Sequence, residues 1–191
     1  MTQPKRLIVA ITGASGTLYG IRLLKALKQT DIQTHLVMSD AAKITMASET
    51  HYQVSDVHEL ADEVHLIRNV GASIASGSFK TMGMVIAPCS VNTLSEVAWG
   101  STSNLITRAA DVVLKERRRL VLLFRETPLH AGHIKSMGQV TENGAIVMPP
   151  VPALYAKPQS VQDVVDHTVG RVLDLFDIEN HLVQRWQGVG K

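Results

Sequence analysis

Short apolar runs alternate with stretches of helical periodicity along most of the chain. Five of the runs predict strands, at residues 7–11, 34–38, 84–87, 120–124 and 145–148. The runs are continuous in apolar character, which is typical of strands buried on both faces of a sheet. Amphipathic spacing predicts helices over residues 18–27, 41–49, 94–98, 109–114, 132–141 and 161–176. Ser39 or Asp40 is expected to cap the second helix.

This order of elements predicts an α/β fold. Strands that alternate with helices are joined by right-handed crossovers, which gives a parallel sheet with helices on both faces. The polar stretch 50–81 is expected to be mostly irregular, and Pro88 is expected to end the strand before it. No repeat or linker divides the chain, so the sequence predicts a single domain over residues 1–191.

Composition narrows the class of protein further. The chain has 191 residues and a formal net charge of +2, with 45% hydrophobic residues. This charge gives no electrostatic reason to expect nucleic acid or an anionic membrane as a partner. No apolar run approaches the roughly 20 residues of a membrane span. The N-terminus lacks a signal-peptide pattern, and the one cysteine excludes an intramolecular disulfide, so we expect a soluble cytoplasmic protein.

The residues after each strand are the first candidates for function, because parallel α/β sheets bind ligands beyond the carboxyl ends of their strands. Residues 12–16, Thr-Gly-Ala-Ser-Gly, open a helix and offer free N–H groups to an anion. The spacing matches neither a G-x-G-x-x-G nor a Walker A loop. Residues 88–93 form a second hydroxyl-rich turn before a helix. The two helix N-termini together predict a site that binds an anion. For the first of them, the alternative is a tight strand-to-helix turn that binds no ligand.

Other reactive side chains have simpler explanations. Cys89 is either a nucleophile or, as we favour, a buried inert thiol. Arg125 and Glu126 follow a strand and are either functional or a surface ion pair. His130 and His133 lack an acidic third ligand, and the acidic residues of 163–177 lack a doubled aspartate, so we expect no metal site.

The order and spacing of several motifs resemble the UbiX-type flavin prenyltransferases, a family long regarded as aromatic-acid decarboxylases. The stretches that carry the resemblance are 12–16, 19–20, 37–39, 88–93, 108–117, 125–128, 148–152 and 155–160, with Arg171, Arg185 and Trp186. The resemblance covers nearly the whole chain. It implies a Rossmann-like or flavodoxin-like subunit, assembled as a dodecamer with reduced FMN bound between subunits.

The resemblance also implies an activity and its residues. Members transfer the dimethylallyl group of dimethylallyl phosphate to N5 and C6 of reduced FMN, without a metal. The prenylated FMN serves a partner UbiD-type decarboxylase, in ubiquinone biosynthesis or aromatic-acid decarboxylation. Matched to the family, the residues expected to contact FMN are Gly13, Ala14, Ser15, Ser39, Ser90, Val91, Asn92, Thr93 and Arg125. Those expected to bind the substrate phosphate are Arg108, Lys115, Tyr155 and Arg171. Those expected to take part in catalysis are Ser15, Glu49, Glu126 and Trp186.

The chemistry agrees with these residue types. Breaking the C–O bond of the ester leaves an allylic cation and a phosphate dianion, so fixed cations are needed where the negative charge develops. Trp186 offers a π face to the allylic cation, and Glu126 is placed to transfer protons. Three alternatives stay open: an FMN-dependent decarboxylase of the related cysteine-decarboxylase fold, a direct aromatic-acid decarboxylase, and a non-catalytic flavin-binding protein.

Overall fold

The computed structural model describes residues 4–183, 185 and 188. The contacts within the chain divide it into two compact units, Met1–Pro149 and Pro150–Lys191. Each unit is described by itself below. The single domain over residues 1–191 stays a prediction.

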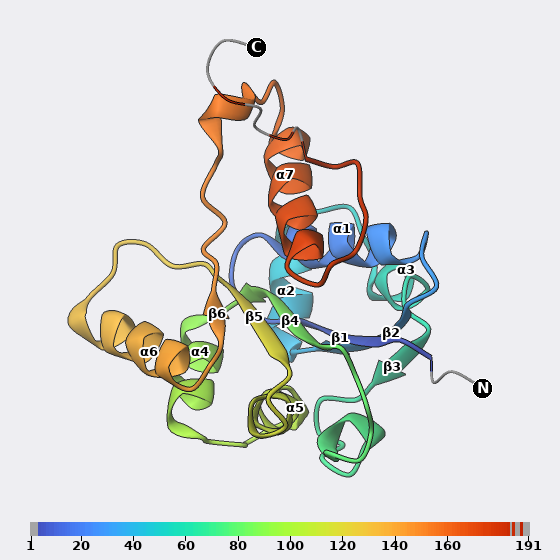
Figure 1. Ribbon diagram of the computed structural model, residues 1–191, viewed down its shortest axis with the longest axis vertical. Helices are drawn as coiled ribbons and strands as arrows, with labels where there is room; N and C mark the ends of the chain where they lie inside the picture. The colour runs from blue at the N-terminus through green and yellow to red at the C-terminus, as the bar shows by residue number, and fades with distance from the viewer. Residues whose placement is uncertain (1–3, 184, 186–187, 189–191) are drawn as a thin grey trace. The chain divides into compact units, whose positions relative to one another are not determined.

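A parallel sheet forms the centre of the first unit (Figure 1). In the described part of the chain it has six strands in the order β3-β2-β1-β4-β5-β6. Their bounds are β1 Arg6–Ile11, β2 Gln33–Met38, β3 Glu63–His65, β4 Gly83–Cys89, β5 Arg119–Phe124 and β6 Ile146–Val147. All five pairings are parallel across these described strands. The α/β class predicted from the alternating pattern is therefore confirmed.

The strand order reverses direction between β1 and β4. The chain first moves outward from β1 to β2 and β3, and then returns to the other side of β1 to add β4, β5 and β6. This is the doubly wound order of Rossmann-type sheets. Such a switch point leaves a crevice beyond the carboxyl ends of the two central strands, where ligands bind.

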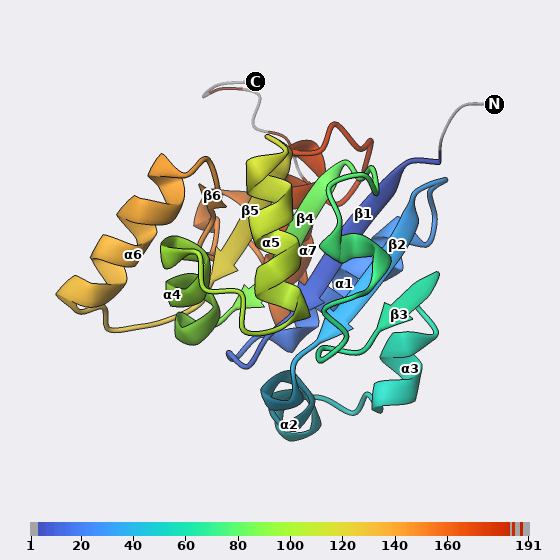
Figure 2. The same cartoon turned by 90° about the horizontal axis from the view of Figure 1, so that it is seen from below.

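Helices cover both faces of this sheet. Figure 1 shows α1 (Thr17–Leu27) and α3 (Val54–His58) over one face, and Figure 2 shows α4 (Val91–Trp99), α5 (Leu105–Lys115) and α6 (Ala131–Glu142) over the other. Helix α2 (Asp40–Glu49) follows the carboxyl end of β2. The strand interiors are almost wholly buried, as continuous apolar runs require.

Close packing of α1 on the sheet depends on Gly20. A Cβ atom built on Gly20 would lie against the carbonyl oxygen of Ala87 and the side chain of Ile11. The absence of a side chain lets the helix axis approach β1 and β4 closely. Helix α1 is thereby fixed at the switch point, with its N-terminus at the carboxyl end of β1.

The local predictions were right in part. The stretch 50–81 is mostly irregular, as expected, but it also contains α3, the short edge strand β3 and a 3₁₀ turn, η1 (Ser73–Ala75). Strand β4 does not end at Pro88 but continues to Cys89, with its pairing to β5 shifted between Ile86 and Cys89. A bulge of this kind accommodates a proline, which has no N–H to donate to the ladder.

The second unit contains a 3₁₀ turn, η2 (Leu154–Ala156), and one long helix, α7 (Val161–Asp174), in its described residues. Ser160 caps α7, and the capping box is completed by Asp163. The amphipathic spacing over residues 161–176 predicted this helix correctly, although the helix ends two residues earlier than expected. Across the described residues of both units, no helix is both long and apolar enough to cross a membrane.

Candidate functional site

A cavity of about 580 Å³ lies at the carboxyl ends of the central strands of the first unit. Its lining comes from the loops after β1, β2, β4 and β5 and from the start of α5. The lining residues are Gly13, Ala14, Ser15, Ser39, Ala41, Ile67, Ser90, Val91, Asn92, Thr93, Asn104, Ile106, Arg125 and Glu126. All nine predicted FMN contacts are among them. The structure therefore brings the predicted cofactor residues together in one cavity at the switch point.

A buried hydroxyl joins the two central strands at this point. Thr12 is 1% exposed, and its Oγ1 donates to the carbonyl oxygen of Pro88 at 2.8 Å. The same oxygen accepts a hydrogen bond from the backbone N–H of Ser90 at 2.8 Å. Two neighbouring bonds continue the connection, from Ser39 N to Ile11 O at 3.0 Å and from Arg125 N to Cys89 O at 3.1 Å. The four loops around the cavity are thus held in register with each other.

Three helices begin at the cavity with polar caps. Ser39 Oγ accepts from Ala42 N at 3.0 Å to cap α2, which confirms the expected cap. Ser90 Oγ accepts from Thr93 N at 3.3 Å to cap α4. Asn104 Oδ1 caps α5. Helix N-termini carry a partial positive charge, and their first N–H groups have no partner within the helix. Their convergence on one cavity favours an anionic ligand.

The N-terminus of α1 already holds an anion. Glu49, at the end of α2, accepts from Gly16 N at 2.9 Å and from Thr17 N at 3.4 Å. Partial burial raises the pKa of Glu49, but hydrogen bonds from Ser15, Gly16 and Thr17 outweigh this and leave the pKa below its usual value. Glu49 does not line the cavity but contacts Ser15, which does. The first of the two anion sites predicted from sequence, at the N-terminus of α1, is therefore occupied by the carboxylate of Glu49.

Arg125 and Glu126 both line the cavity, just beyond the last residue of β5. The charge of Arg125 lies near Tyr19, whose pKa is raised by burial and lowered in smaller part by Arg125. Glu126 Oε1 accepts from Thr127 N at 2.8 Å. The cavity wall thus carries one guanidinium and one carboxylate side by side in sequence. Cys89, by contrast, is fully buried, and burial raises its thiol pKa, which fits the inert thiol that we favoured.

The predicted phosphate residues of α5 do not line this cavity. Arg108 forms an ion pair with Asp111 at 2.9 Å, and Lys115 forms one with Glu116 at 2.6 Å. Lys115 lies at the far end of α5 from Ile106, about 13 Å along the helix axis. It lines a separate cavity with residues of α4 and α6. Lys115 therefore lies at the other end of α5 from the cavity.

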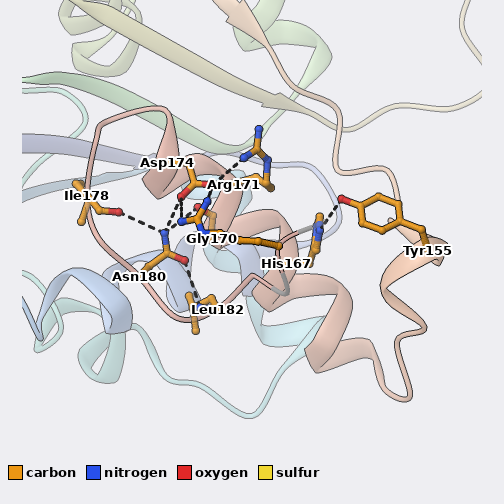
Figure 3. A network of polar contacts seen from close by, with 9 residues as sticks. Tyr155, His167, Gly170, Arg171, Asp174, Ile178, Asn180 and Leu182 are labelled. Carbon is orange, nitrogen blue, oxygen red and sulfur yellow. Dashed lines mark hydrogen bonds and ion pairs between the residues drawn. The ribbon is translucent and has the colours of Figure 1, made fainter. Parts of the chain in front are cut away.

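The other two predicted phosphate residues belong to the second unit (Figure 3). Tyr155, in η2, shares a hydrogen bond of 3.2 Å with His167 Nε2 of α7. Arg171 follows His167 by four residues, so the two side chains lie on the same side of α7. Arg171 pairs with Asp174 at 2.7 Å, and Asp174 also pairs with Arg185 at 2.9 Å. Within this unit, Arg171 lies on α7, and Tyr155 of η2 is joined to the same helix through His167.

Some site residues escaped the sequence analysis. The cavity wall includes Ala41, Ile67, Asn104 and Ile106, which were not predicted. Asn104 directly precedes an apolar helical pattern, a recognisable N-cap signal. Ile67 falls in the stretch that was expected to be irregular. Trp186, predicted to face the allylic cation, lies outside the described residues.

The fold and the cavity together define a protein that binds an anionic cofactor at a doubly wound switch point. Comparison with known proteins specifies the class: residues 1–173 match the family model described as Flavoprotein. Curated relatives named flavin prenyltransferase UbiX align over nearly the whole length. The Escherichia coli K12 protein is 58% identical, over 96% of this chain and 99% of its own. The Thauera aromatica protein is 56% identical, over 96% and 94%. The chain belongs to the UbiX-type flavin prenyltransferase family.

Solved structures agree with this assignment. AnUbiX, solved in complex with FMN and dimethylallyl pyrophosphate, is 49% identical with a TM-score of 0.96, over 97% of this chain and 99% of its own. A dodecameric FMN-dependent UbiX-like decarboxylase from Escherichia coli O157:H7 is 47% identical with a TM-score of 0.94, over 96% and 100%. The FMN-dependent cysteine decarboxylase TvaF is 14% identical with a TM-score of 0.62, which shows a common fold alone.

Proposed function

We propose that this protein transfers the dimethylallyl group of dimethylallyl phosphate to N5 and C6 of reduced FMN. The observation that carries the proposal is the cavity at the switch point, which is lined by all nine residues predicted to contact FMN. The complex of AnUbiX with FMN and dimethylallyl pyrophosphate supports FMN together with a phosphorylated dimethylallyl donor. The prenylated FMN would then serve a UbiD-type decarboxylase, in ubiquinone biosynthesis or aromatic-acid decarboxylation. We place the reaction in the cytoplasm.

The residues of the cavity fit a flavin mononucleotide. A volume of about 580 Å³ lies within the range of ligand sites. Ala14, Ala41, Ile67, Val91 and Ile106 supply apolar surface for a planar ring. The capped start of α4 and the guanidinium of Arg125 supply N–H donors and positive charge for one phosphate. When bound in its reduced form, FMN supplies the nucleophilic N5 and C6 atoms.

We place the FMN phosphate at the start of α4 rather than at α1. Sequence alone predicted that both helix openings would hold it. Glu49 already accepts from Gly16 N at 2.9 Å, and a phosphate there would meet its negative charge. The opening at Ser90 has no such carboxylate among its capping contacts in the described chain. Arg125, on the same cavity wall, balances the phosphate charge.

The departing phosphate of the prenyl donor needs cations of its own, and the described lining of this cavity offers only Arg125, which the FMN phosphate would engage. Lys115 lies about 13 Å along α5 from the cavity wall at Ile106. We propose that Lys115 and Arg108 act at the cavity of a neighbouring copy, with Tyr155 and Arg171 completing the phosphate site. The dodecamer of the Escherichia coli O157:H7 protein supports an assembly of this kind. The active site would then be shared between subunits.

The remaining predicted residues act on protons and on the cation. Glu126, on the cavity wall, is proposed to move a proton between the reacting carbon and the departing phosphate. Ser15 lines the reaction space, and Glu49 fixes the Ser15 hydroxyl through their hydrogen bond. Trp186 is proposed to stabilise the allylic cation through its π face. No step in this scheme uses a metal ion.

Mass spectrometry of the flavin tests the proposal directly. The purified protein is incubated anaerobically with reduced FMN and either dimethylallyl phosphate or dimethylallyl diphosphate. With dimethylallyl phosphate we expect a flavin heavier by one dimethylallyl unit. The incubation with dimethylallyl diphosphate measures which donor the protein prefers. Unmodified flavin with both donors would overturn the proposal. Light scattering tests the shared site, since a species at the subunit mass of 20.8 kDa alone would contradict it.

Direct decarboxylation is the second candidate. A structure described as phenylacrylic acid decarboxylase from Aquifex aeolicus is 39% identical with a TM-score of 0.85, over 93% of this chain. Release of CO₂ from an aromatic acid by this protein and FMN alone would favour that activity. The cysteine-decarboxylase alternative lacks its Pro-x-Met-Asn-x-x-Met-Trp motif in this sequence. A flavin-binding protein without catalysis would leave the prenyl donor unchanged in the same assay.

A further inference from the structure

Three metal-ligating side chains meet at the edge of the sheet, away from the flavin cavity. His35 lies in β2, and Glu63 and His65 lie in the edge strand β3. Strand register pairs His35 with Glu63, and residues two apart in a strand point to the same side. One ligand atom from each of the three lies within 4.8 Å of the other two. None of the three lines the flavin cavity.

The triangle formed by these atoms has the dimensions of a metal site. His35 Nδ1 is 3.0 Å from His65 Nε2, Glu63 Oε2 is 3.4 Å from His35 Nδ1, and Glu63 Oε1 is 3.5 Å from His65 Nε2. A tetrahedral Zn²⁺ with bonds of about 2.0–2.1 Å separates its ligand atoms by about 3.3–3.4 Å. The two imidazole nitrogens and the carboxylate therefore already lie close to the separations that the ion requires. We propose that His35, Glu63 and His65 bind Zn²⁺ or a chemically similar divalent transition-metal ion.

The hydrogen bond between the two histidines shows what metal binding would replace. His35 Nδ1 and His65 Nε2 share a hydrogen bond of 3.0 Å, so one of the two nitrogens carries a proton when no metal is bound. A metal ion would displace that proton, since it binds neutral imidazole through the free lone pair. Ligation through Nδ1 also requires the His35 proton to lie on Nε2. In the described chain Nε2 is buried without a hydrogen-bond partner, so no donor opposes that tautomer.

The surroundings define the kind of site. His35 and His65 are 1% and 8% exposed, whereas the Glu63 side chain is 47% exposed. The ion would thus have two buried nitrogen ligands, one carboxylate and an open position for water on the solvent side. Arg6 stacks on Phe79 beside His35 and opposes a cation, whereas Glu63 and Asp62 favour it. The ion would fasten the three-residue strand β3 to β2. It lies outside the proposed reaction, which uses no metal.

Cobalt titration tests the site on the intact protein with FMN bound. After EDTA treatment and removal of the chelator, Co²⁺ is added and the visible absorption of four-coordinate cobalt is followed. Zn²⁺ is then added as a competitor. We expect one Co²⁺ per chain, displaced by one Zn²⁺. We also expect Zn²⁺ at about 100 times its Kd to raise the Tm by about 5–10 °C.

Glu63→Gln is the decisive variant, because its side chain is half exposed and the fold does not depend on burying it. We expect it to weaken metal binding at least about tenfold, by analogy with changes around metal ligands. Glu59→Gln and His51→Gln, both exposed and outside the triangle, should bind as the unchanged protein does. The proposal is overturned if cobalt shows no four-coordinate spectrum, or if Glu63→Gln binds as tightly as Glu59→Gln.

Discussion

Thr12 and Ser90 connect the two halves of the doubly wound sheet. The Thr12 hydroxyl accepts from Ser90 N at 2.8 Å and donates to Pro88 O at 2.8 Å, so one oxygen joins the ends of β1 and β4. Both residues adjoin the flavin cavity, which Ser90 lines. The geometry of the proposed FMN site therefore depends on a side chain that the ligand does not have to touch.

Thr12→Val removes this hydroxyl and keeps the shape of the side chain. It leaves the partly buried Ser90 N–H without its acceptor, and the loss of such a partner costs about 1–3 kcal/mol at a fully buried site, so we expect the lower end of that range. We expect chemical denaturation to show this decrease in the free energy of unfolding, with weaker FMN binding by fluorescence titration. Thr45→Val is the control, because within the described residues the Thr45 hydroxyl makes one exposed bond, to Ala41 O of its own helix. Equal stability of the two variants would contradict the prediction.

Gly20→Ala tests the close approach of α1 to the sheet. The added Cβ atom would overlap Ala87 O and Ile11, and overpacking of this kind costs about 1–3 kcal/mol. Gly138→Ala, in the exposed middle of α6, meets no atom within 4 Å. It should instead stabilise the protein by about 0.5–1 kcal/mol. Thermal unfolding should therefore shift in opposite directions, and a shift in the same direction would refute the packing argument.

Glu49→Gln tests the carboxylate that caps α1. Loss of an N-cap contact costs about 0.5–2 kcal/mol, and the lower end applies to this exposed position. The pKa of Glu49 is lower in the folded protein than its ordinary value of 4.5. The folded state therefore binds fewer protons, so this stabilisation is present at neutral pH and is lost as pH falls below about 4.5. When chemical denaturation is measured from pH 7 to pH 3, the free energies of unfolding of the variant and of the unchanged protein should converge as the pH falls. Glu179→Gln should keep the original pH dependence.

Glu126→Gln tests the proposed proton transfer. The variant keeps the shape of the side chain and removes the base, and such groups contribute about 10²–10⁴-fold to a rate. We expect unchanged FMN affinity and melting, with product formation slower by that factor when followed by mass spectrometry of the flavin. If Glu126 had only a structural role, the variant would lose stability and keep its rate at saturating donor. Glu59→Gln, exposed and lining neither the flavin cavity nor the cavity at Lys115, controls for the change of charge.

Removal of divalent metal should leave product formation intact. The proposed reaction holds the phosphate with Arg108, Lys115, Tyr155 and Arg171 rather than with a metal ion. The initial rate with EDTA, measured well below the Tm, should equal the rate without it. An EDTA-inhibited rate restored by Mg²⁺ would contradict this scheme. A lower Tm in EDTA with an unchanged rate would instead agree with a metal at His35, Glu63 and His65.

The sequence predicted the elements whose signals are local. Continuous apolar runs located β1, β2, β4 and β5, because strands buried on both faces need them. Strand β3 was missed because it has three residues, and Glu63 and Val64 are exposed at the sheet edge. A strand of three residues is too short to show the alternation of apolar and polar residues that identifies longer strands. Its position follows from pairing with β2.

Some residues of the candidate site could likewise be predicted from local sequence patterns, and others could not. Residues that follow strands, such as Ser39 and Arg125, could be placed in one cavity because parallel strands end at one edge. Ile67 reaches the cavity through a stretch without helical or strand periodicity, so no pattern marked it. The opposite positions of Lys115 and the flavin cavity could not be predicted either. Only the direction of α5 in the fold separates them.

Glu49 also bears on which nucleotides this fold can accept. In doubly wound proteins that bind dinucleotides, the pyrophosphate lies at the N-terminus of the first helix. Here that place is taken by a carboxylate 2.9 Å from Gly16 N, and the second strand is followed by Ser39 rather than by an acid for the ribose. A pyrophosphate bridge would meet like charge, whereas a single phosphate can bind at α4 instead. We therefore expect this one side chain from the second helix to favour mononucleotides over FAD and NAD.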